Sequence, residues 1–292
     1  MKKLMYALPK YIVIPIACIA IFFMAQAFLY NGEPYGFSFV GYGGTFVQPT
    51  FEFLGLNIYW ILVLLGLAVS VIVAVLRRKE YGIHLPVAIA IGIGFFVQAL
   101  IGAKILYGIE RTIWRGGIEY FSMSSQSLYG TLFMSFMVIP LLAILLRKKV
   151  ASMFDYITPL WLVLLCFTRF GCFIQGCCGS YDMVLFGHPI VLPEQLFEVI
   201  CDLLILQLCF SVEKKKFEGT LKKTWLAYDG TLFIMLLTLY GSCRFLLEFL
   251  RKSDFTWAGM SFGQIYSVIC ILIGLIAFFI IYQRQKRNPM HN

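Results

Sequence analysis

The chain has 292 residues, of which 60% are hydrophobic and only 13% are charged, and its mean hydropathy is +0.84. Because a soluble domain carries about 25% charged residues, this composition excludes an ordinary water-soluble protein and makes lipid the solvent for much of the chain. The formal charge of +9 lies in short basic clusters between apolar stretches, which is typical of loops beside a membrane and argues against nucleic-acid binding.

Apolar stretches follow one another along the whole chain. About 20 residues are needed to cross a bilayer as a helix, and a shorter stretch covers 196–212. The stretches of sufficient length fall near 11–31, 54–76, 85–107, 128–146, 156–176, 229–250 and 261–283. The sequence therefore predicts an all-α, polytopic membrane protein with about eight transmembrane helices.

The first stretch follows three lysines, as in a signal peptide, but no small-residue cleavage site ends it, so we interpret it as a retained anchor. The segment that follows, 32–53, is rich in glycine and aromatic residues, which favours an interfacial loop. We accordingly divide the chain into 1–50, an anchor helix with an outer loop, and 51–292, the main membrane domain.

The basic residues predict the orientation of the helices. If the N-terminus is cytoplasmic and the helices alternate, 17 of the 24 basic residues fall in cytoplasmic segments, as the positive-inside rule requires. Both termini are then cytoplasmic. These 17 residues are Lys2, Lys3, Lys10, Arg77, Arg78, Lys79, Arg147, Lys148, Lys149, Lys214, Lys215, Lys216, Lys222, Lys223, Arg284, Lys286 and Arg287.

Several polar residues interrupt the apolar helices, and in this topology all of them occupy the outer half of the membrane. A charge in the hydrocarbon costs about 2.5–3.5 kcal/mol even on a lenient scale, so such residues are functional candidates. The alternative is that they pair and only hold helices together. They are Tyr59, Lys104, Tyr129, Arg169, Glu198, Asp202, Arg244 and Gln264.

The charge of this outer layer suggests an anionic ligand. Glu248 lies one turn after Arg244, which favours a local ion pair, yet the layer holds more cations than nearby carboxylates. Arginine suits a phosphate because its planar fork donates two parallel hydrogen bonds and stays charged when buried. A lipid phosphate of the outer leaflet would lie at this depth.

The most distinctive segment runs from Arg169 to Gly179 and reads Arg-Phe-Gly-Cys-Phe-Ile-Gln-Gly-Cys-Cys-Gly. Its thiols, Cys172, Cys177 and Cys178, raise the alternative of a metal or redox site. Adjacent cysteines chelate poorly, and His188 is the nearest histidine. Most of the nine cysteines lie in apolar stretches, without the spacing of a zinc site or a disulfide framework, so we predict no metal.

This segment resembles the signature of the prolipoprotein diacylglyceryl transferase family, Arg-x-Gly-x-Phe-x-x-Gly, at Arg169, Gly171, Phe173 and Gly176. Three further stretches are similar in the same order. They are Leu192-Pro-Glu-Gln-Leu-Phe-Glu198, Arg244-Phe-Leu-Leu-Glu248-Phe-Leu-Arg251 and Met260-Ser-Phe-Gly-Gln264. The resemblance runs from about Phe51 to the last helix and makes 51–292 a transferase-like domain of seven helices, to which the first helix is an addition.

The chain also departs from the family pattern. The family has a His-Gly-Gly near the start of the helix at 128, where this chain has Leu128-Tyr129-Gly130. An Asn within the signature is Cys172 here, an acid is Cys177, and Lys104 stands where the family tends to have Arg. The arginines expected to grip phosphate are present, whereas the expected proton-handling histidine is not.

The resemblance implies a reaction in the bacterial cytoplasmic membrane. The diacylglyceryl group of phosphatidylglycerol passes to the lipobox cysteine thiol of a prolipoprotein, without a metal or an organic cofactor. It implies catalytic roles for Arg169 and Arg244 on the phosphate, Tyr129 on the glyceryl unit and Glu248 on Arg244. The substrate-binding residues it implies are Tyr59, Lys104, Gly171, Gly176, Gln195, Glu198 and Gln264.

Two other functions remain open from the sequence. A diverged relative would transfer a lipid or a phosphoglycerol unit to another acceptor. A non-enzymatic carrier or transporter of anionic lipid would be favoured by broken helices in an inverted repeat, and the sequence shows no such repeat.

Overall fold

The computed structural model describes most of the predicted membrane domain and a short part of the N-terminal segment. Its long helices are α2 (Ile58–Arg77), α3 (Leu85–Arg115), α4 (Leu128–Leu145), α5 (Val150–Gln175), α6 (Glu194–Phe217) and α9 (Phe262–Arg287). Residues 231–250 form one rod of four short pieces: α7 (Thr231–Met235), η2 (Leu236–Tyr240), α8 (Gly241–Leu247) and η3 (Glu248–Leu250). The described residues are 11, 13–22, 52–53, 56–115, 127–175, 182–185, 188–191, 193–221, 224–251, 256–257 and 259–287.

Short hairpins and one turn join these helices. Residues Trp225–Ala227 form the 3₁₀ turn η1 before α7. Each two-stranded hairpin is antiparallel, so its strands need only a short link. The paired strands are β1 (Glu52–Phe53) with β2 (Leu56–Asn57), β3 (Asp182–Leu185) with β4 (His188–Val191), and β5 (Thr256–Trp257) with β6 (Met260–Ser261).

The prediction of an all-α, polytopic membrane protein is confirmed. Seven helices within the described residues are long and apolar enough to cross a bilayer. The stretch predicted as short, 196–212, is a full-length helix in the structure, α6. Of the predicted first helix, an apolar stretch at Val13–Phe22 is described, and the rest of 11–31 lies outside the described residues.

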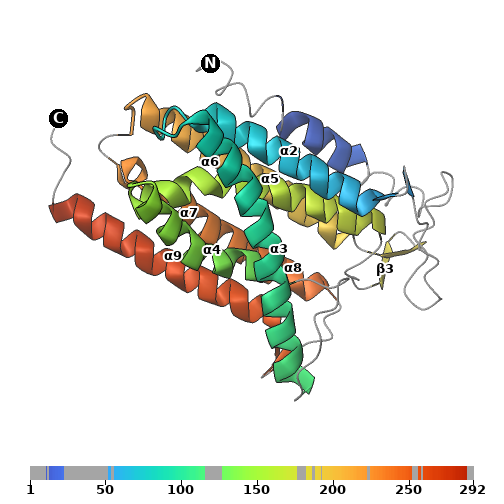
Figure 1. The fold of residues 1–292 in the computed structure, drawn as a ribbon. Helices are drawn as coiled ribbons and strands as arrows, with labels where there is room; N and C mark the ends of the chain where they lie inside the picture. Colours follow the sequence, from blue (N-terminus) through green and yellow to red (C-terminus); the bar gives the residue numbers. More distant parts are fainter. Residues whose placement is uncertain are drawn as a thin grey trace.

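The helices pack around α5, which lies side by side with α2 in Figure 1 and also packs against α6. In α5, 83% of the apolar span is buried, against 28% in α2 and 22% in α9. The outward faces of the other helices are apolar: in α3, Ile89, Ile93 and Val97 form part of an exposed stripe at helical spacing. Such a surface is stable only against lipid tails.

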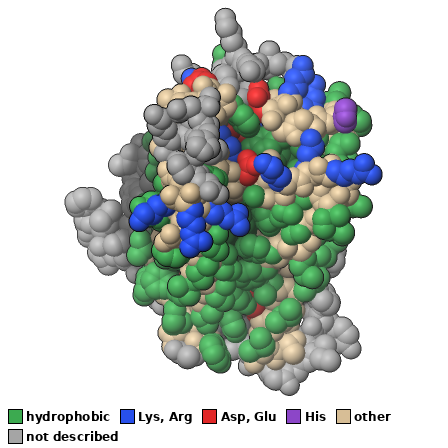
Figure 2. Space-filling view, turned by 90° about the vertical axis from the view of Figure 1, so that its left-hand side faces the viewer, with side chains coloured by type: hydrophobic (Ala, Val, Ile, Leu, Met, Phe, Trp, Pro, Cys, Tyr) green, Lys and Arg blue, Asp and Glu red, His purple; other side chains and the backbone are tan. Residues whose placement is uncertain are grey.

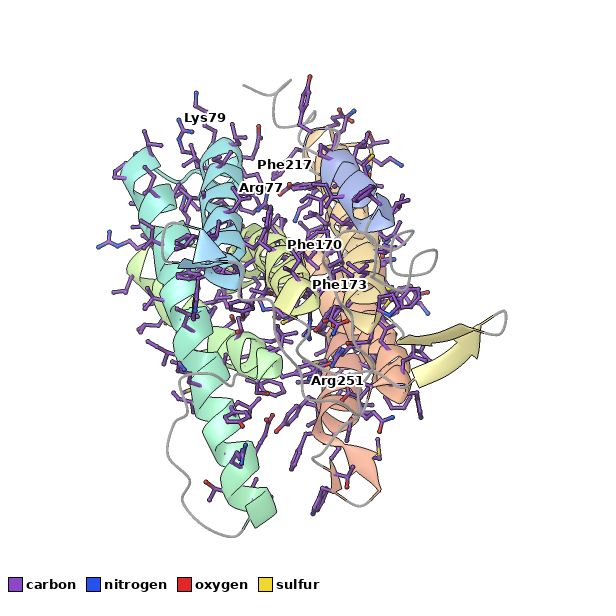
Figure 3. All side chains as sticks on the ribbon, turned by 90° about the vertical axis from the view of Figure 1, so that its right-hand side faces the viewer. Arg77, Lys79, Phe170, Phe173, Phe217 and Arg251 are labelled. Atoms are coloured by element: carbon purple, nitrogen blue, oxygen red, sulfur yellow. The ribbon has the colours of Figure 1, made fainter. Side chains whose placement is uncertain are left out.

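The basic clusters gather at one end of the bundle, as Figure 2 shows from that side. There, the ends of α2, α6 and α9 and the link between α4 and α5 carry most of the lysines and arginines that the structure describes. One of these residues, Arg77, is not a solvated loop charge, because its side chain is fully buried. Figure 3 shows Arg77 and Arg251 toward opposite ends of the bundle.

Arg77 joins three helices. Its Nη2 lies 2.5 Å from the Glu213 carboxylate on α6, and its Nη1 donates to the Tyr156 carbonyl on α5 at 2.5 Å. The hydroxyl of Tyr81 donates to the same carboxylate at 2.7 Å. Burial and the Glu213 charge raise the pKa of Tyr81 well above its ordinary value, so this phenol remains a neutral donor.

A second buried carboxylate, Asp155 of α5, caps the N-terminal end of the segment 231–250. Asp155 accepts hydrogen bonds from the backbone N–H groups of Gly230 and Leu232, at 2.9 and 2.8 Å, and pairs with Lys216 at 3.1 Å. The first N–H groups of a helix have no intrahelical partners, and here a carboxylate from a neighbouring helix accepts their hydrogen bonds. The basic end of the bundle is therefore held by charged groups that satisfy one another.

Candidate active site

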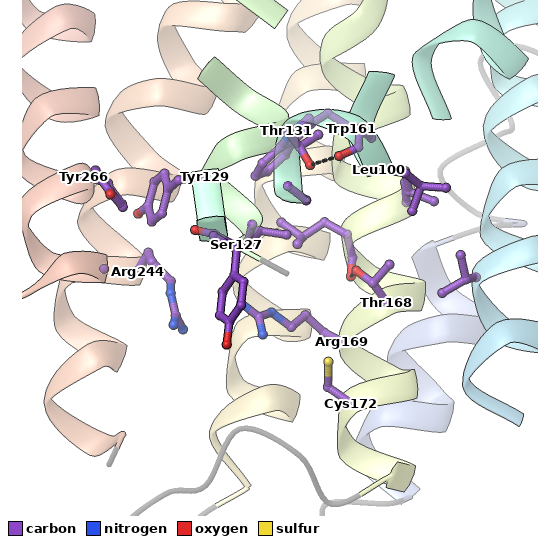
Figure 4. Close-up of a pocket in the computed structure, with 18 of the residues that line it drawn as sticks. Leu100, Ser127, Tyr129, Thr131, Trp161, Thr168, Arg169, Cys172, Arg244 and Tyr266 are labelled. Atoms are coloured by element: carbon purple, nitrogen blue, oxygen red, sulfur yellow. Dashed lines mark hydrogen bonds between the residues drawn. The ribbon is translucent and has the colours of Figure 1, made fainter. Parts of the chain in front are cut away.

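The polar side chains in the apolar helices gather at the other end of the bundle, where α2, α4, α6 and α9 begin and α5 ends. Several of them, including Tyr59, Tyr129, Arg169 and Arg244, line a cavity of about 240 Å³. Figure 4 shows Arg169 of α5 and Arg244 of α8 at this cavity, with Tyr129 beside Arg244. Apolar side chains such as Phe96 and Leu100 complete the lining, so the cavity suits a ligand with a polar and an apolar part.

Carboxylates hold both arginines in place. Arg244, which is 3% exposed, contacts Glu194 and Glu198 through Nη1, the latter at 3.0 Å, and Glu248 through Nη2 at 2.5 Å. The Nε atom of Arg169 lies 2.8 Å from Glu198, so this carboxylate stands between the two guanidinium groups. Because the partners of Arg244 lie on two turns of α6 and on η3, the fold determines the orientation of its guanidinium plane.

The charge balance differs from the sequence-based expectation of surplus cation. Three carboxylates, Glu194, Glu198 and Glu248, match the three arginines Arg169, Arg244 and Arg251 in this cluster. The expectation was wrong because it counted neighbours along the chain, whereas Glu194 and Glu198 reach Arg244 from another helix. The cluster therefore presents directed donors without an excess of positive charge among these six residues.

Tyr129 lines the cavity at the start of α4, and its ring is buried. Its hydroxyl lies 2.6 Å from Ser267 Oγ on α9. Ser267 donates its only proton to the Gly263 carbonyl at 2.7 Å, so Tyr129 is the donor to Ser267. The phenol therefore connects α4 to α9 and has its proton engaged.

Tyr59 and Gly171 form a matched pair. Tyr59, at the start of α2, lines the cavity, and Gly171 lies on α5 behind it. A Cβ atom at Gly171 would lie 2.7 Å from Cδ2 of Tyr59, closer than side chains approach. Gly171 thus shapes the site by making room for Tyr59.

Gln264 lies in the first turn of α9 and forms a reciprocal cap with Ser261. The Ser261 backbone N–H donates to Gln264 Oε1 at 3.0 Å, and the Gln264 backbone N–H donates to Ser261 Oγ at 3.1 Å. The Ser261 hydroxyl also donates to Glu248 at 3.0 Å. Gln264 does not line the cavity and contributes to the site through this cap, which places Ser261 against Glu248.

Three residues that the sequence predicts to bind substrate remain: Lys104, Gln195 and Gly176. Lys104 and Gln195 are described, but neither lines the cavity. Gly176 lies outside the described residues, as do Cys177 and Cys178. The described Cys172 lines the cavity one turn after Arg169 (Figure 4). A role in substrate binding stays a prediction for Lys104, Gln195 and Gly176.

Glu110 was missed by the sequence analysis. It lines the cavity, is 7% exposed, and accepts a hydrogen bond from the Ser127 hydroxyl at 2.6 Å and one from Tyr266. The predicted helix ended at residue 107, whereas α3 continues to Arg115, which carries Glu110 into the site. The sequence feature that could have pointed to Glu110 is its position one turn beyond the end of the apolar stretch 85–107.

The part of the chain that the structure describes contains no group of three or more His, Cys, Asp or Glu side chains that could hold a metal ion. The donors around the cavity are guanidinium, phenol and hydroxyl groups, and the acceptors are carboxylates engaged with those donors. This donor set suits hydrogen bonding to an oxyanion.

A model of the prolipoprotein diacylglyceryl transferase family matches residues 48–280. The chain belongs to this family. Its match begins just before α2 and ends within α9, so it covers the cavity and the basic end of the bundle. The chain is accordingly a multi-pass membrane protein of a transferase family.

Similar proteins from several bacteria carry the name phosphatidylglycerol–prolipoprotein diacylglyceryl transferase. One from Dehalococcoides mccartyi is 28% identical over 137 residues, 42% of this chain and 48% of that protein. One from Ehrlichia ruminantium is 32% identical over 115 residues, 37% and 38% of the two chains. One from Clostridium tetani is 25% identical over 250 residues, 78% and 95%. The chain thus spans about half or less of the length of the first two relatives and most of the third.

Proposed function

We propose that this protein transfers the diacylglyceryl group of phosphatidylglycerol to the lipobox cysteine thiol of prolipoproteins. The observation that carries the proposal is the cavity lined by Arg169 and Arg244, in a chain whose family and relatives bear the name of this reaction. We place the protein in the bacterial cytoplasmic membrane with both termini in the cytoplasm. The basic clusters support this orientation, since they lie at the end of the bundle opposite the cavity, which then opens toward the outer leaflet.

The reaction forms a C–S bond and breaks a C–O bond. The thiolate sulfur attacks the glyceryl carbon that bears the phosphate ester, the electron pair leaves on the phosphate oxygen, and glycerol phosphate departs. Charge grows on that phosphate, so donors fixed in advance around it lower the barrier. Arg169 and Arg244 provide such donors, while Tyr59 and Tyr129 shape the wall beside the glyceryl unit.

The test is transfer in vesicles that contain labelled phosphatidylglycerol and a lipobox peptide, with the peptide product identified by mass. Arg169→Lys keeps the charge opposite Glu198 but loses the planar fork, so we expect about a 100-fold loss of transfer, the scale of removing one oxyanion donor. Lys79→Ala, an exposed residue at the basic end, serves as the control and is expected to transfer like wild type. Full activity of Arg169→Lys, or no peptide product with wild type, contradicts the proposal.

The missing histidine favours one alternative, a relative that uses another acceptor. The chain has three histidines, His84, His188 and His291. His84 lies before α3, at the basic end, and does not line the cavity. The same assay separates this alternative, because phosphatidylglycerol would be consumed without modification of the peptide. A lipid carrier would move the labelled lipid without any covalent product.

A further inference from the structure

The proposed transfer requires a group that takes the proton of the acceptor thiol. A free thiol has a pKa of about 8.5, so most of it is protonated at neutral pH and is a poor nucleophile. In this chain the position expected for the family's histidine is occupied by Leu128-Tyr129, and the Tyr129 hydroxyl donates its proton to Ser267. The site must therefore supply a base from elsewhere.

The carboxylates that contact Arg169, Arg244 and Arg251 form ion pairs with these guanidinium groups. Glu194 and Glu198 hold Arg244, and Glu248 contacts the same residue at 2.5 Å while accepting from Ser261. These contacts direct the three carboxylates at guanidinium and hydroxyl donors within the protein. We therefore assign them to positioning the arginines and not to accepting the thiol proton.

Glu110 has a different environment. It lines the same cavity and is nearly buried, and its hydrogen bonds come from the hydroxyls of Ser127 and Tyr266. Hydroxyl partners hold the carboxylate in one orientation without adding a positive charge to it. The backbone N–H of Ser127 donates to the Ala103 carbonyl at 3.0 Å, which fixes the start of α4 against α3 and keeps this hydroxyl in place.

The charges that face Glu110 come from several elements. Arg251, after η3, attracts its charge, and Glu248 of the same rod repels it. Tyr266 approaches from α9 and Ser127 from the start of α4. On α3 itself, the guanidinium of Arg111 donates to Tyr107, which lines the cavity one turn before Glu110.

Glu110 lies near the C-terminal end of α3. The helix has 31 residues, whereas about 20 span the hydrocarbon, so its C-terminal part extends beyond the bilayer core. Figures 1 and 3 show this end of α3 projecting past the neighbouring helices. In the proposed orientation this end of α3 faces the outer surface, where the acceptor peptide is presented.

We propose that Glu110 is the catalytic residue that accepts the thiol proton, an inference that rests on the proposed transferase function. The S–H proton passes to the Glu110 carboxylate, the sulfur forms the C–S bond, and the C–O bond breaks with its electron pair on the departing phosphate. Glu110 then releases the proton to water or to glycerol phosphate. No oxidant, reductant or metal enters this balance.

The test is the pH dependence of kcat/KM for peptide modification by Glu110→Gln, between about pH 6 and about pH 9. A positioned base contributes about 10² to 10⁴ in rate, so we expect at least about a 100-fold loss at pH 7. The loss shrinks as the pH approaches about 8.5, because the peptide thiol then ionises without help. KM for phosphatidylglycerol stays within about threefold of wild type, since the arginines are intact. Glu218→Gln, at the exposed end of α6, is the matched control and keeps the wild-type profile.

Two further variants keep the result interpretable. Glu110→Asp retains a carboxylate and is expected to keep the wild-type pH profile at a reduced rate, and it replaces Glu110→Gln if that variant fails to fold. Ser127→Ala removes the 2.6 Å hydrogen bond but leaves the carboxylate, and should lose about tenfold or less. A wild-type rate for Glu110→Gln, or an equal loss at every pH, overturns the role. Absence of transfer by wild type instead overturns the proposed function, and this role with it.

Discussion

At the residue scale, the two arginines that the sequence singled out are not equivalent. Arg244 directs Nη1 to Glu194 and Glu198 and Nη2 to Glu248, so most of its donors are engaged within the protein. Arg169 meets Glu198 through Nε, the atom at the root of its fork. Besides lining the cavity, Arg244 therefore links α6 to the segment 231–250.

Tyr129 is the residue for which the structure most changes the sequence-based role. Its hydroxyl donates to Ser267, and Ser267 remains a donor to the Gly263 carbonyl when that contact is removed. We expect Tyr129→Phe to lose about 1 kcal/mol of stability, the net value of one hydrogen bond, and less than about tenfold in transfer. Thermal unfolding in detergent and the peptide assay measure the two effects. A loss of transfer activity of more than about 100-fold with unchanged stability would show that Tyr129 takes part in the reaction.

The sequence could identify Arg169, Arg244 and Glu248, since a buried charge in an apolar helix stands out in a hydropathy profile. It could not show Glu198 between the two arginines, because that pairing joins α5, α6 and α8 across long stretches of chain. Glu110 escaped for a simpler reason. Hydropathy marks the apolar part of a helix, and α3 continues past it.

At the element scale, hydropathy predicted where the helices lie but not how they are built. The stretch 229–250 was predicted as one helix, and the structure contains a wide π turn at Leu236–Tyr240 within it. Such turns often occur at functional sites. Here the turn carries Tyr240, whose hydroxyl donates to Glu198 at 3.0 Å and so adds a donor to the carboxylate that both arginines share. The hydrophobic periodicity of the sequence does not reveal this π turn, because the turn depends on packing against α6 and α9.

The close contact between Gly171 of α5 and Tyr59 of α2 provides a prediction at the element scale. Gly171→Ala would place a Cβ 2.7 Å from Cδ2 of Tyr59 and force that ring toward the cavity. We expect about 1–3 kcal/mol of destabilisation from overpacking and about a tenfold or greater loss of transfer, because displacements near 1 Å are costly in a reacting site. Gly94→Ala in α3 is the matched control, since nothing lies within 4 Å of its Cβ position. Equal behaviour of the two variants would show that the Gly171–Tyr59 contact is unimportant.

At the scale of the whole molecule, two polar clusters occupy opposite ends of a bundle built around α5. The cavity cluster lines an open space, whereas the Arg77 cluster at the basic end is filled by protein groups, with Glu213, Tyr81 and two backbone carbonyls around one guanidinium. The positive-inside pattern could be predicted from the sequence, but it treated Arg77 as one more loop charge. The structure assigns it to the interior, where its loss should affect folding and leave the distant cavity intact.

Glu213→Gln tests this separation of stability from activity. Removing the carboxylate leaves Arg77 buried without its charged partner, and breaking a buried ion pair from one side costs about 3–5 kcal/mol. We therefore expect a marked fall in the thermal unfolding temperature in detergent, with transfer per folded molecule unchanged, because the cavity lies at the other end of the bundle (Figure 3). Glu218→Gln, exposed at the end of the same helix, should shift stability by about 0.5 kcal/mol or less. If Glu213→Gln instead loses transfer at full stability, the two ends of the bundle are coupled, and the basic cluster takes part in the reaction cycle.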